Sequence, residues 1–381
     1  MKRLYWRPRQ VSQTVIWLMA GFSLLGLASV ERFRTSAPQT DLDTKMEAAT
    51  YASEMMRAIK AEKMHMSQLA ESSVDPAGSG MIGQLMSPVT TLTGRLSAKQ
   101  TAVNPNFAAV VVEQLIDAGV KQGDLVAVGY SGSFPGMNVN VCAALKAVGA
   151  QPIIIASAGS SQWGANNPDF MWVDMESLLS EEGLLPFRSV ACSIGGYEDI
   201  GLGMTTEAKD MVKKAIKRNN LSLLQSTDFV EAIDERMQIY RKQSGGRDYA
   251  AYINVGGGTI SVGRSMGKRA YKPGLNLSAT RDVLQIDSVM TRFMSKGIPV
   301  IHEVEIDRMA TKYGLPLAPQ QMPPIGEGGV YNLTRYNKLW TGIVLVSILL
   351  SLRALVLTDF GYRFVKGRGG KKTDKSPEPM V

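Results

Sequence analysis

The sequence predicts an α/β fold: a mostly parallel sheet with helices on both faces, as in a Rossmann-like three-layer domain. A short apolar run over 125–128 has the length of a buried strand and ends in a Gly/Ser loop. Pro135 then opens an apolar pattern at helical spacing, Gly149 closes it, and a second apolar run covers 152–156. Strand, loop, helix and strand in this order form a βαβ unit, whose two strands are parallel neighbours in one sheet.

The residues before this unit predict helices and one strand. An apolar stripe at spacings of three and four predicts a long helix over 41–69, which we interpret as a stalk packed along the domain. The threonine-rich stretch 87–95 is typical of a strand, although its hydroxyls are also suited to face a ligand. Asn104 and Pro105 form a cap and first turn, and they predict the start of another helix.

Alternating helices and strands are predicted after the βαβ unit. Apolar runs followed by glycine indicate strands over 187–194 and 297–301. The segment 249–263 is interpreted as two β runs joined by three glycines. The predicted helices cover 170–179, Thr205 or Thr206 to about Arg218, a segment from Thr227, a segment around 286–293, and 304–312.

The two ends of the chain differ from its middle. The run 11–30 has no charged residue and is long enough to span a bilayer. The run 339–358 is equally long, and Arg353 is its only charged residue. A cleaved signal peptide is the alternative for the first run. We favour an uncleaved helix, because the apolar stretch is long for a signal peptide and no clear small-x-small site follows it.

Positive charge flanks these two runs on their outer sides. The net charge of +8 comes from the first ten residues, from Arg353 and from the tail after 358. The positive-inside rule therefore predicts that both termini are cytoplasmic and that the middle of the chain lies outside, at the cell (inner) membrane. Membrane orientation explains the basic balance, so we expect no nucleic-acid partner.

These observations divide the chain into seven parts. They are a cytoplasmic basic N-terminus (1–10), a transmembrane helix (11–30), a helical stalk and loop (31–86), an extracytoplasmic α/β domain (87–315), a linker (316–338), a second transmembrane helix (339–358) and a cytoplasmic basic tail (359–381).

Cysteine and histidine are scarce. Cys142 and Cys192 are too few for a disulfide framework, and we interpret both as buried thiols. His65 and His302 are the only histidines, which argues against a multi-histidine metal centre. We expect neither a metal site nor a cofactor.

The small-residue loops of a parallel sheet converge at the carboxyl ends of its strands, where ligands bind. Gly132 and Ser133 precede a helix N-terminus, so their backbone N–H groups suit a phosphate or a carboxylate. Three consecutive glycines permit close approach of the backbone to a ligand, and a tight hairpin without ligand is the alternative. The candidate ligand-binding residues are Ser131, Gly132, Ser133, Asn138, Ser160, Ser161, Trp163, Asn166, Asn254, Gly256, Gly257, Gly258 and Thr259.

Nucleophilic catalysis is a weaker interpretation of the same loops. Ser131 or Ser133 is a candidate nucleophile, and His302 is the one candidate base, with Glu303 or Asp307 to orient it. The pattern around Ser131 only loosely matches a nucleophile elbow, because Gly132 breaks the spacing. We therefore favour anion binding and leave open whether the protein is an enzyme.

A dense basic strip follows the glycines. It contains four cationic residues within nine positions, and a solvated helix face is the alternative interpretation. The four residues of this basic strip are Arg264, Lys268, Arg269 and Lys272.

Two motifs resemble those of the poly-γ-glutamate system protein family: Gly-Ser-Phe-Pro at 132–135 and Ser-x-Trp-Gly-Ala-Asn at 161–166. The similarity extends over nearly the whole chain, including the first apolar segment, the run SPVTTLTGRLSAKQTAVNPNFAAVVVEQL and the closing run GIPVIHEVEIDRMATKYGLPLAP. Members are encoded beside the ligase and membrane subunits that make and export poly-γ-glutamate in bacteria. The second apolar run and its tail are longer here than in a typical member.

The resemblance implies a membrane-anchored accessory component of poly-γ-glutamate capsule or exopolymer production. Its expected partners are the membrane and either the polymer or the synthase and export subunits, and the basic strip is the expected polymer contact. The family implies no catalytic residue, because its activity is unassigned. The alternatives are a serine-dependent hydrolase or amide-transferring enzyme acting on the polymer, and a sensor domain on a helical stalk.

Overall fold

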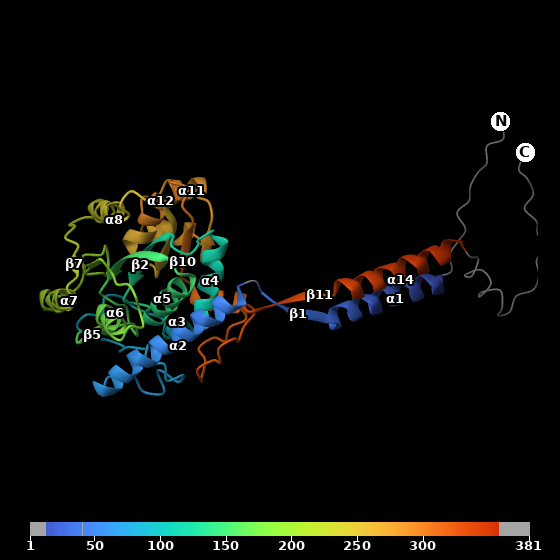
Figure 1. Ribbon diagram of the computed structural model, residues 1–381, viewed down its shortest axis with the longest axis horizontal. Coiled ribbons are helices and arrows are strands. Elements are labelled where there is room, and N and C mark those ends of the chain that lie inside the picture. The colour runs from blue at the N-terminus through green and yellow to red at the C-terminus, as the bar shows by residue number, and fades with distance from the viewer. Residues whose placement is uncertain (1–12, 40, 358–381) are drawn as a thin grey trace, which may run out of the picture. The chain divides into compact units, whose positions relative to one another are not determined.

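The computed structural model describes residues 13–39 and 41–357, which form two compact units (Figure 1). The larger unit covers 38–331. The smaller unit combines the described residues before 38 with those from Asn332 onward. The larger unit therefore extends beyond the expected 87–315 domain on both sides.

A seven-stranded sheet organises the larger unit, in the order β7-β6-β3-β2-β8-β10-β9. All neighbouring strands are parallel except β9, which pairs antiparallel with β10 at one edge. The predicted α/β fold with a mostly parallel sheet is therefore confirmed. The strands are β2 (Leu125–Ser131), β3 (Gln151–Ser157), β6 (Ala191–Ser193), β7 (Ser222–Leu223), β8 (Tyr249–Val255), β9 (Gly274–Asn276) and β10 (Val300–Glu303).

Helices cover both faces of this sheet, and each face has its own apolar core. Two cores form because alternate side chains of a strand point to opposite faces. In β2, Val126 and Val128 join one apolar core and Ala127 joins the other. The first core contains α4 (Phe107–Asp117), α5 (Pro135–Val148), α6 (Trp172–Glu181), α7 (Thr206–Arg218) and α13 (Ile306–Tyr313). The second contains α8 (Phe229–Gln243), α9 (Thr259–Val262), α11 (Arg281–Leu284) and α12 (Val289–Met294).

The long helix predicted near 41–69 is confirmed as α2 (Leu42–His65). It packs against α4 and α5, and its small residues Ala48, Ala49 and Ala52 are fully buried in the first core. Buried Lys45 pairs with Glu113 at 2.8 Å and donates to the carbonyl oxygen of Val330 at 3.0 Å. Helix α2 is thus an integral layer of the larger unit.

Two predictions about local structure were wrong. The second β run after the glycines is the short helix α9, whose Ile260 and Val262 pack into the second core. The threonine-rich stretch 87–95 contains no strand, only a bridge between Thr90 and Ser160. The Thr90 hydroxyl instead accepts from the backbone N–H of Ser87 at 2.9 Å, so this threonine stabilises a turn.

Several short elements complete the larger unit and were not predicted as such. They are α3 (Leu96–Ala102), β4 (Asn166–Asn167), β5 (Phe170–Met171) and α10 (Arg264–Ala270). The threonine cap predicted for α7 is confirmed, since the Thr205 hydroxyl accepts from the backbone N–H of Ala208 at 3.2 Å.

The smaller unit consists of an antiparallel helix pair, α1 (Gln13–Arg32) and α14 (Lys338–Leu357), and a two-stranded sheet of β1 (Arg34–Pro38) and β11 (Asn332–Tyr336). The Trp340 indole N–H donates to the Ser29 hydroxyl at 2.6 Å. A side-chain carbon added at Gly26 would lie 2.8 Å from Cγ1 of Val344, so the glycine lets the two helices approach closely.

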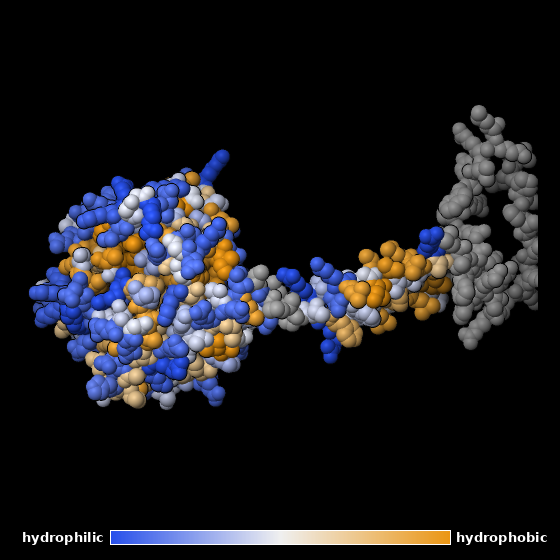
Figure 2. Space-filling model, in the orientation of Figure 1, coloured by the Kyte–Doolittle hydropathy of each residue, from blue (hydrophilic) through white to orange (hydrophobic). Residues whose placement is uncertain are grey.

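Both helices of the smaller unit are long and apolar enough to cross a membrane. On the face shown in Figure 2, apolar side chains gather along the two helices. A signal sequence near the N-terminus passes the same test of length and composition. The predicted basic N-terminus (1–10) and basic tail (359–381) lie outside the described residues.

Candidate functional site

The sheet order creates a switch point between β2 and β8. From β2 the chain moves outward through β3, β6 and β7, and it then returns to the other side of β2 with β8 and β10. The loops that leave β2 and β8 therefore diverge, and ligands of open α/β sheets bind in the crevice at such a point.

The loop after β2 contacts the loop after β3, as predicted. The Ser133 hydroxyl accepts from the backbone N–H of Ser161 at 3.0 Å, and Gly132 N–H donates to the carbonyl oxygen of Ser157 at 3.0 Å. Ala165 N–H donates to the carbonyl oxygen of Gly132 at 2.9 Å. These bonds hold the two loops together as one structure.

The triple glycine lies next to the same loops. Gly256 has a φ of +91°, and a side-chain carbon added there would lie 3.3 Å from Cβ of Ser131. A carbon added at Gly257 would lie 3.6 Å from Cε of Lys268 in the basic strip. The glycines thus connect Ser131 with the basic strip, although none of the three lines the cavity described below.

Several candidate ligand-binding residues hold the loops in place. The Asn138 amide donates to the carbonyl oxygen of Ser131 at 2.9 Å. The Asn166 amide accepts from Gln84 N–H at 2.9 Å and donates to the Gln84 carbonyl at 2.8 Å. Trp163 N–H donates to that same carbonyl at 2.9 Å, and the Ser160 hydroxyl donates to the carbonyl oxygen of Ser161 at 2.9 Å. These contacts give Asn138, Asn166 and Ser160 a positioning role.

The structure brings His302 to Asn254 and away from the candidate serines. The Asn254 amide donates to the carbonyl oxygen of Gly256 at 2.6 Å and contacts His302 Nδ1 at 3.0 Å. Burial lowers the pKa of His302 to about 4, because the imidazolium loses its hydration. Within the described residues no hydrogen bond joins His302 to Ser131 or Ser133, so the geometry does not form the suggested serine–histidine pair.

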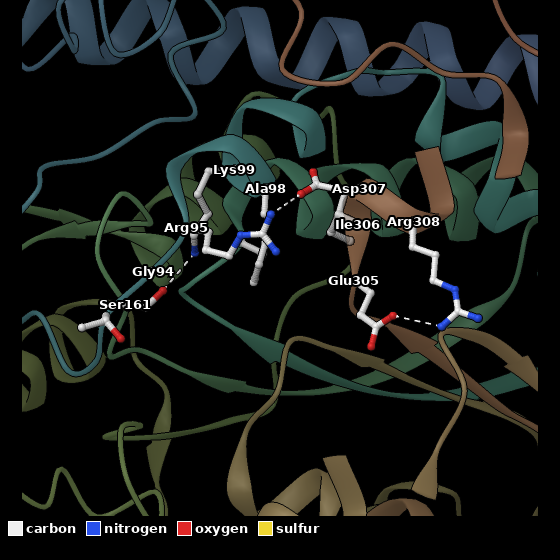
Figure 3. A pocket seen from close by; sticks show the side chains of 11 residues that line it. Gly94, Arg95, Ala98, Lys99, Ser161, Glu305, Ile306, Asp307 and Arg308 are labelled. Atoms are coloured by element: carbon white, nitrogen blue, oxygen red, sulfur yellow. Dashed lines mark hydrogen bonds and ion pairs between the residues drawn. The ribbon is translucent and has the colours of Figure 1, made fainter. Parts of the chain in front are cut away.

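A cavity of about 530 Å³ lies beside the loop after β2 (Figure 3). Its walls come from the turn before α3, from α3 itself, from the two contacting loops and from the start of α13. The lining residues are Thr93, Gly94, Arg95, Ala98, Lys99, Phe134, Ser161, Glu305, Ile306, Asp307 and Arg308.

Lys99 lines this cavity and is only 3% exposed. Its ammonium donates to the carbonyl oxygen of Ser133 and to the hydroxyl oxygen of Ser161, the latter at 2.9 Å. The nitrogen also lies 3.8 Å from the centre of the Phe134 ring. Burial lowers the pKa of Lys99 to about 7, because the charged form is desolvated and no carboxylate in the described chain forms an ion pair with it.

Paired charges occupy the opposite wall. Arg95 forms an ion pair with Asp307 at 2.9 Å, and Asp307 also accepts from the Thr101 hydroxyl at 2.9 Å. Arg308 pairs with Glu305 at 3.3 Å. Figure 3 shows both pairs, with Asp307 turned toward Arg95 and away from the buried lysine. Lys99 is therefore the lining cation that has no acidic partner in the described residues.

The four residues of the basic strip are exposed, but they differ in whether they form an ion pair. Arg264 pairs with Glu198 at 2.7 Å and lies 4.2 Å over the Phe229 ring. Lys268, Arg269 and Lys272 are exposed and make no ion pair with any described residue. These three cations are free to meet an anionic partner.

A second polar cluster lies at the carboxyl ends of β3 and β6. The hydroxyls of Ser157 and Ser193 lie 2.8 Å apart, and both donate to one oxygen of Asp199, at 3.0 and 2.8 Å. The other oxygen of Asp199 pairs with Arg236, and both of these side chains are almost fully buried. Every charged group in this cluster has a partner, so we assign it a structural role.

The sequence motifs did not identify Lys99 and Arg95 as site residues. They stand four positions apart and are the only charged residues between 76 and 112. An isolated lysine in a run of small and apolar residues was the signal that could have drawn attention to them.

Comparison with family models, curated proteins and solved structures gave no match to this chain. Within the described residues, no group of three His, Cys, Asp or Glu side chains is placed to hold a metal ion. Arguments about function therefore rest on the geometry of the cavity and its surroundings.

Proposed function

We propose that this chain is a membrane-anchored accessory component of bacterial poly-γ-glutamate synthesis or export, and that its α/β unit binds the anionic polymer. The observation that carries the proposal is a series of cationic groups along the carboxyl edge of the sheet. It begins at Arg95, whose side chain is exposed, passes the glycine loop, and ends at the residues of the basic strip that make no ion pair with any described residue, Lys268, Arg269 and Lys272. The family resemblance of the motifs at 132–135 and 161–166 points to the same polymer.

The physical requirements of the polymer suit such an edge. Poly-γ-glutamate carries one carboxylate per residue, so a binder must present several cations in succession. Each exposed charge pair contributes only ~0.2–1 kcal/mol, and screening acts within about 8 Å at physiological salt. Lys268, Arg269 and Lys272 together would contribute a salt-sensitive affinity, to which N–H groups of the glycine loop add directional contacts.

The proposed location is the cell (inner) membrane, with both termini cytoplasmic and the α/β unit outside. The apolar helices α1 and α14 and the positive charge at the two ends of the sequence support this arrangement. The same surface is also available to the synthase or export subunits, which are the alternative partner.

Retention of the polymer tests the proposal. Full-length protein in detergent is immobilised, and fluorescent poly-γ-glutamate is passed over it at 20 and 300 mM salt. We expect retention at low salt and at least a tenfold loss at high salt. The triple variant Lys268→Ala, Arg269→Ala, Lys272→Ala should lose most of the retention.

The matched control is Lys213→Ala, Lys214→Ala, Lys217→Ala, which removes three exposed cations from α7. This control should retain the polymer as the parent does. Equal loss in both triple variants would mean that only the net charge matters. No retention by the parent would leave the synthase subunits as the partner to test.

A further inference from the structure

We propose that Ser161 is a nucleophile and Lys99 its general base, in an acyl-transfer site that accepts an amide or ester carbonyl. The juxtaposition behind this proposal is direct: the lysine nitrogen and the serine hydroxyl oxygen lie 2.9 Å apart, and both residues line the cavity of about 530 Å³. Serine–lysine pairs are a known variant of the serine–histidine arrangement, and they are recognised by geometry and not by sequence position.

The surroundings of Lys99 direct its lone pair at the serine. One N–H of the lysine donates to the carbonyl oxygen of Ser133. This carbonyl is too weak a base to remove a proton from the lysine. No carboxylate in the described residues pairs with the nitrogen, so the Phe134 ring is the main contact that favours the charged form, and its effect is weaker than that of an ion pair. In the neutral amine, the nitrogen keeps its bond to Ser133 and accepts the Ser161 proton.

The surroundings of Ser161 suit a nucleophile better than those of the neighbouring serines. Its backbone N–H donates to the Ser133 hydroxyl at 3.0 Å, which holds this part of the loop beside the lysine. Its own hydroxyl has Lys99 as its hydrogen-bond partner. Ser160 instead donates to a carbonyl oxygen at 2.9 Å, and Ser131 accepts from the backbone N–H of Ser133 at 3.2 Å.

The protonation state of the lysine fits a base that works near neutral pH. Burial lowers the pKa of Lys99 to about 7, so a substantial fraction of the side chain is neutral at physiological pH. Lys63 is buried as well, and burial lowers its pKa to about 8, but its nitrogen donates to the carbonyl oxygen of Ile82 at 3.2 Å and bonds to no serine in the described part of the chain. Lys63 therefore provides a matched comparison within the chain.

The proposed reaction balances without an external cofactor. Lys99 takes the hydroxyl proton as the Ser161 oxygen forms a bond to the carbonyl carbon. The C–N or C–O bond of the substrate then breaks, and the leaving amine or alcohol receives the proton from Lys99. Water, or an incoming amine, attacks the resulting serine ester and gives its proton to Lys99. The ester C–O bond breaks, the acyl product leaves, and the proton returns to the serine oxygen.

Two arginines of the cavity lining indicate the class of substrate. Arg95 and Arg308 both line the cavity and have exposed side chains, so each can exchange its ion pair with Asp307 or Glu305 for a free carboxylate on the acyl group. A γ-glutamyl amide has this combination. The choice of a γ-glutamyl substrate rests on the proposed function, whereas the assignment of the nucleophile does not.

Labelling with a fluorophosphonate tests the nucleophile without any polymer. Such probes phosphonylate activated serine hydroxyls, and peptide mass spectrometry locates the adduct. In the full-length protein in detergent, we expect one adduct on Ser161, formed at a rate that rises with pH through about 7 and then levels. Ser161→Ala should not be labelled. Lys99→Met should be labelled at least ~10²-fold more slowly, because a general base contributes that much.

Matched variants separate catalysis from folding. Lys63→Met removes the other buried lysine, and Ser193→Ala removes a buried serine that donates to Asp199, so both should be labelled at the parent rate. Lys99→Arg keeps a cation that does not titrate, and it should be as slow as Lys99→Met while its pH dependence disappears. An adduct on another serine, or an unchanged rate in Lys99→Met, would overturn the assignment.

The outcomes distinguish this inference from the proposed function. Labelling of Ser161 in a protein that does not retain poly-γ-glutamate would support the nucleophile and count against the polymer as its substrate. Retention of the polymer by a parent protein that is not labelled at Ser161 would overturn the nucleophile and leave the binding role standing. Shortening of the polymer by the parent, but not by Ser161→Ala, would support both.

Discussion

Replacing Glu303 by glutamine should make the protein more stable at alkaline pH. Glu303 ends β10 and is fully buried. The Gln114 side chain lies near its carboxyl group, but neither carboxyl oxygen makes a hydrogen bond of normal geometry to a described residue. Burial raises the pKa of this carboxyl from 4.5 to about 8, because the carboxylate would lose its hydration. The folded protein therefore keeps Glu303 protonated at neutral pH.

The sign and size of the effect follow from proton linkage. Between pH 4.5 and 8 the unfolded chain has released this proton and the folded chain has not. The free energy of unfolding then falls by about 1.4 kcal/mol for each pH unit, or about 5 kcal/mol over the whole window. Above pH 8 the contribution of Glu303 no longer changes. Glutamine has a similar shape and does not titrate in either state.

Urea denaturation of both proteins from pH 5 to 9 measures the difference, with tryptophan fluorescence reporting on buried Trp172. At pH 5 the two unfolding free energies should agree within about 1 kcal/mol, and at pH 8 the Glu303→Gln variant should be more stable by about 3–5 kcal/mol. Glu176, whose pKa burial raises to about 7, acts in the same direction in both proteins and cancels. A difference that stays constant with pH would refute the reasoning.

Three further predictions concern packing and topology. Asp199→Ala leaves buried Arg236 without its partner and should cost ~3–5 kcal/mol in thermal or urea denaturation, whereas adding Arg236→Met should restore at least half of the loss. Gly26→Ile places a side chain where Val344 lies 2.8 Å away, so disulfide formation between cysteines introduced as Ser29→Cys and Trp340→Cys should fall; an unchanged yield would mean that the helix pair does not depend on this close approach. Reporter fusions after Pro319 and after Lys372 should lie on opposite sides of the membrane, and matching sides would contradict two spans.

The sequence was sufficient to predict the centre of the sheet, because β2, α5 and β3 each have a complete local signal. Long apolar runs, a proline at the first helical turn and a closing glycine agree with one another there. The strand predicted after Gly258 was wrong because tertiary packing overrides the local propensity there. Its β-branched residues favour a strand, but packing of Ile260 and Val262 into the second core stabilises a short helix instead.

The candidate site was predicted only in part for a different reason. Contact between the loops after β2 and β3 follows from the parallel topology, which the sequence reveals. Burial of Lys99 does not, because it depends on α3 packing beside residues 133 and 161, far away in the chain. The pKa of a lysine is set by such tertiary surroundings, so a sequence pattern cannot distinguish this lysine from a solvated one.

Hydrogen exchange of the full-length protein, with and without poly-γ-glutamate, tests most directly whether the carboxyl edge of the sheet binds the polymer. At low salt we expect the polymer to slow exchange in three segments: 93–99, 131–134 and 256–272. Helix α7, with its exposed lysines, should exchange at the same rate in both samples. Protection that is absent from these segments, or that is equally strong in α7, would contradict the proposed binding site.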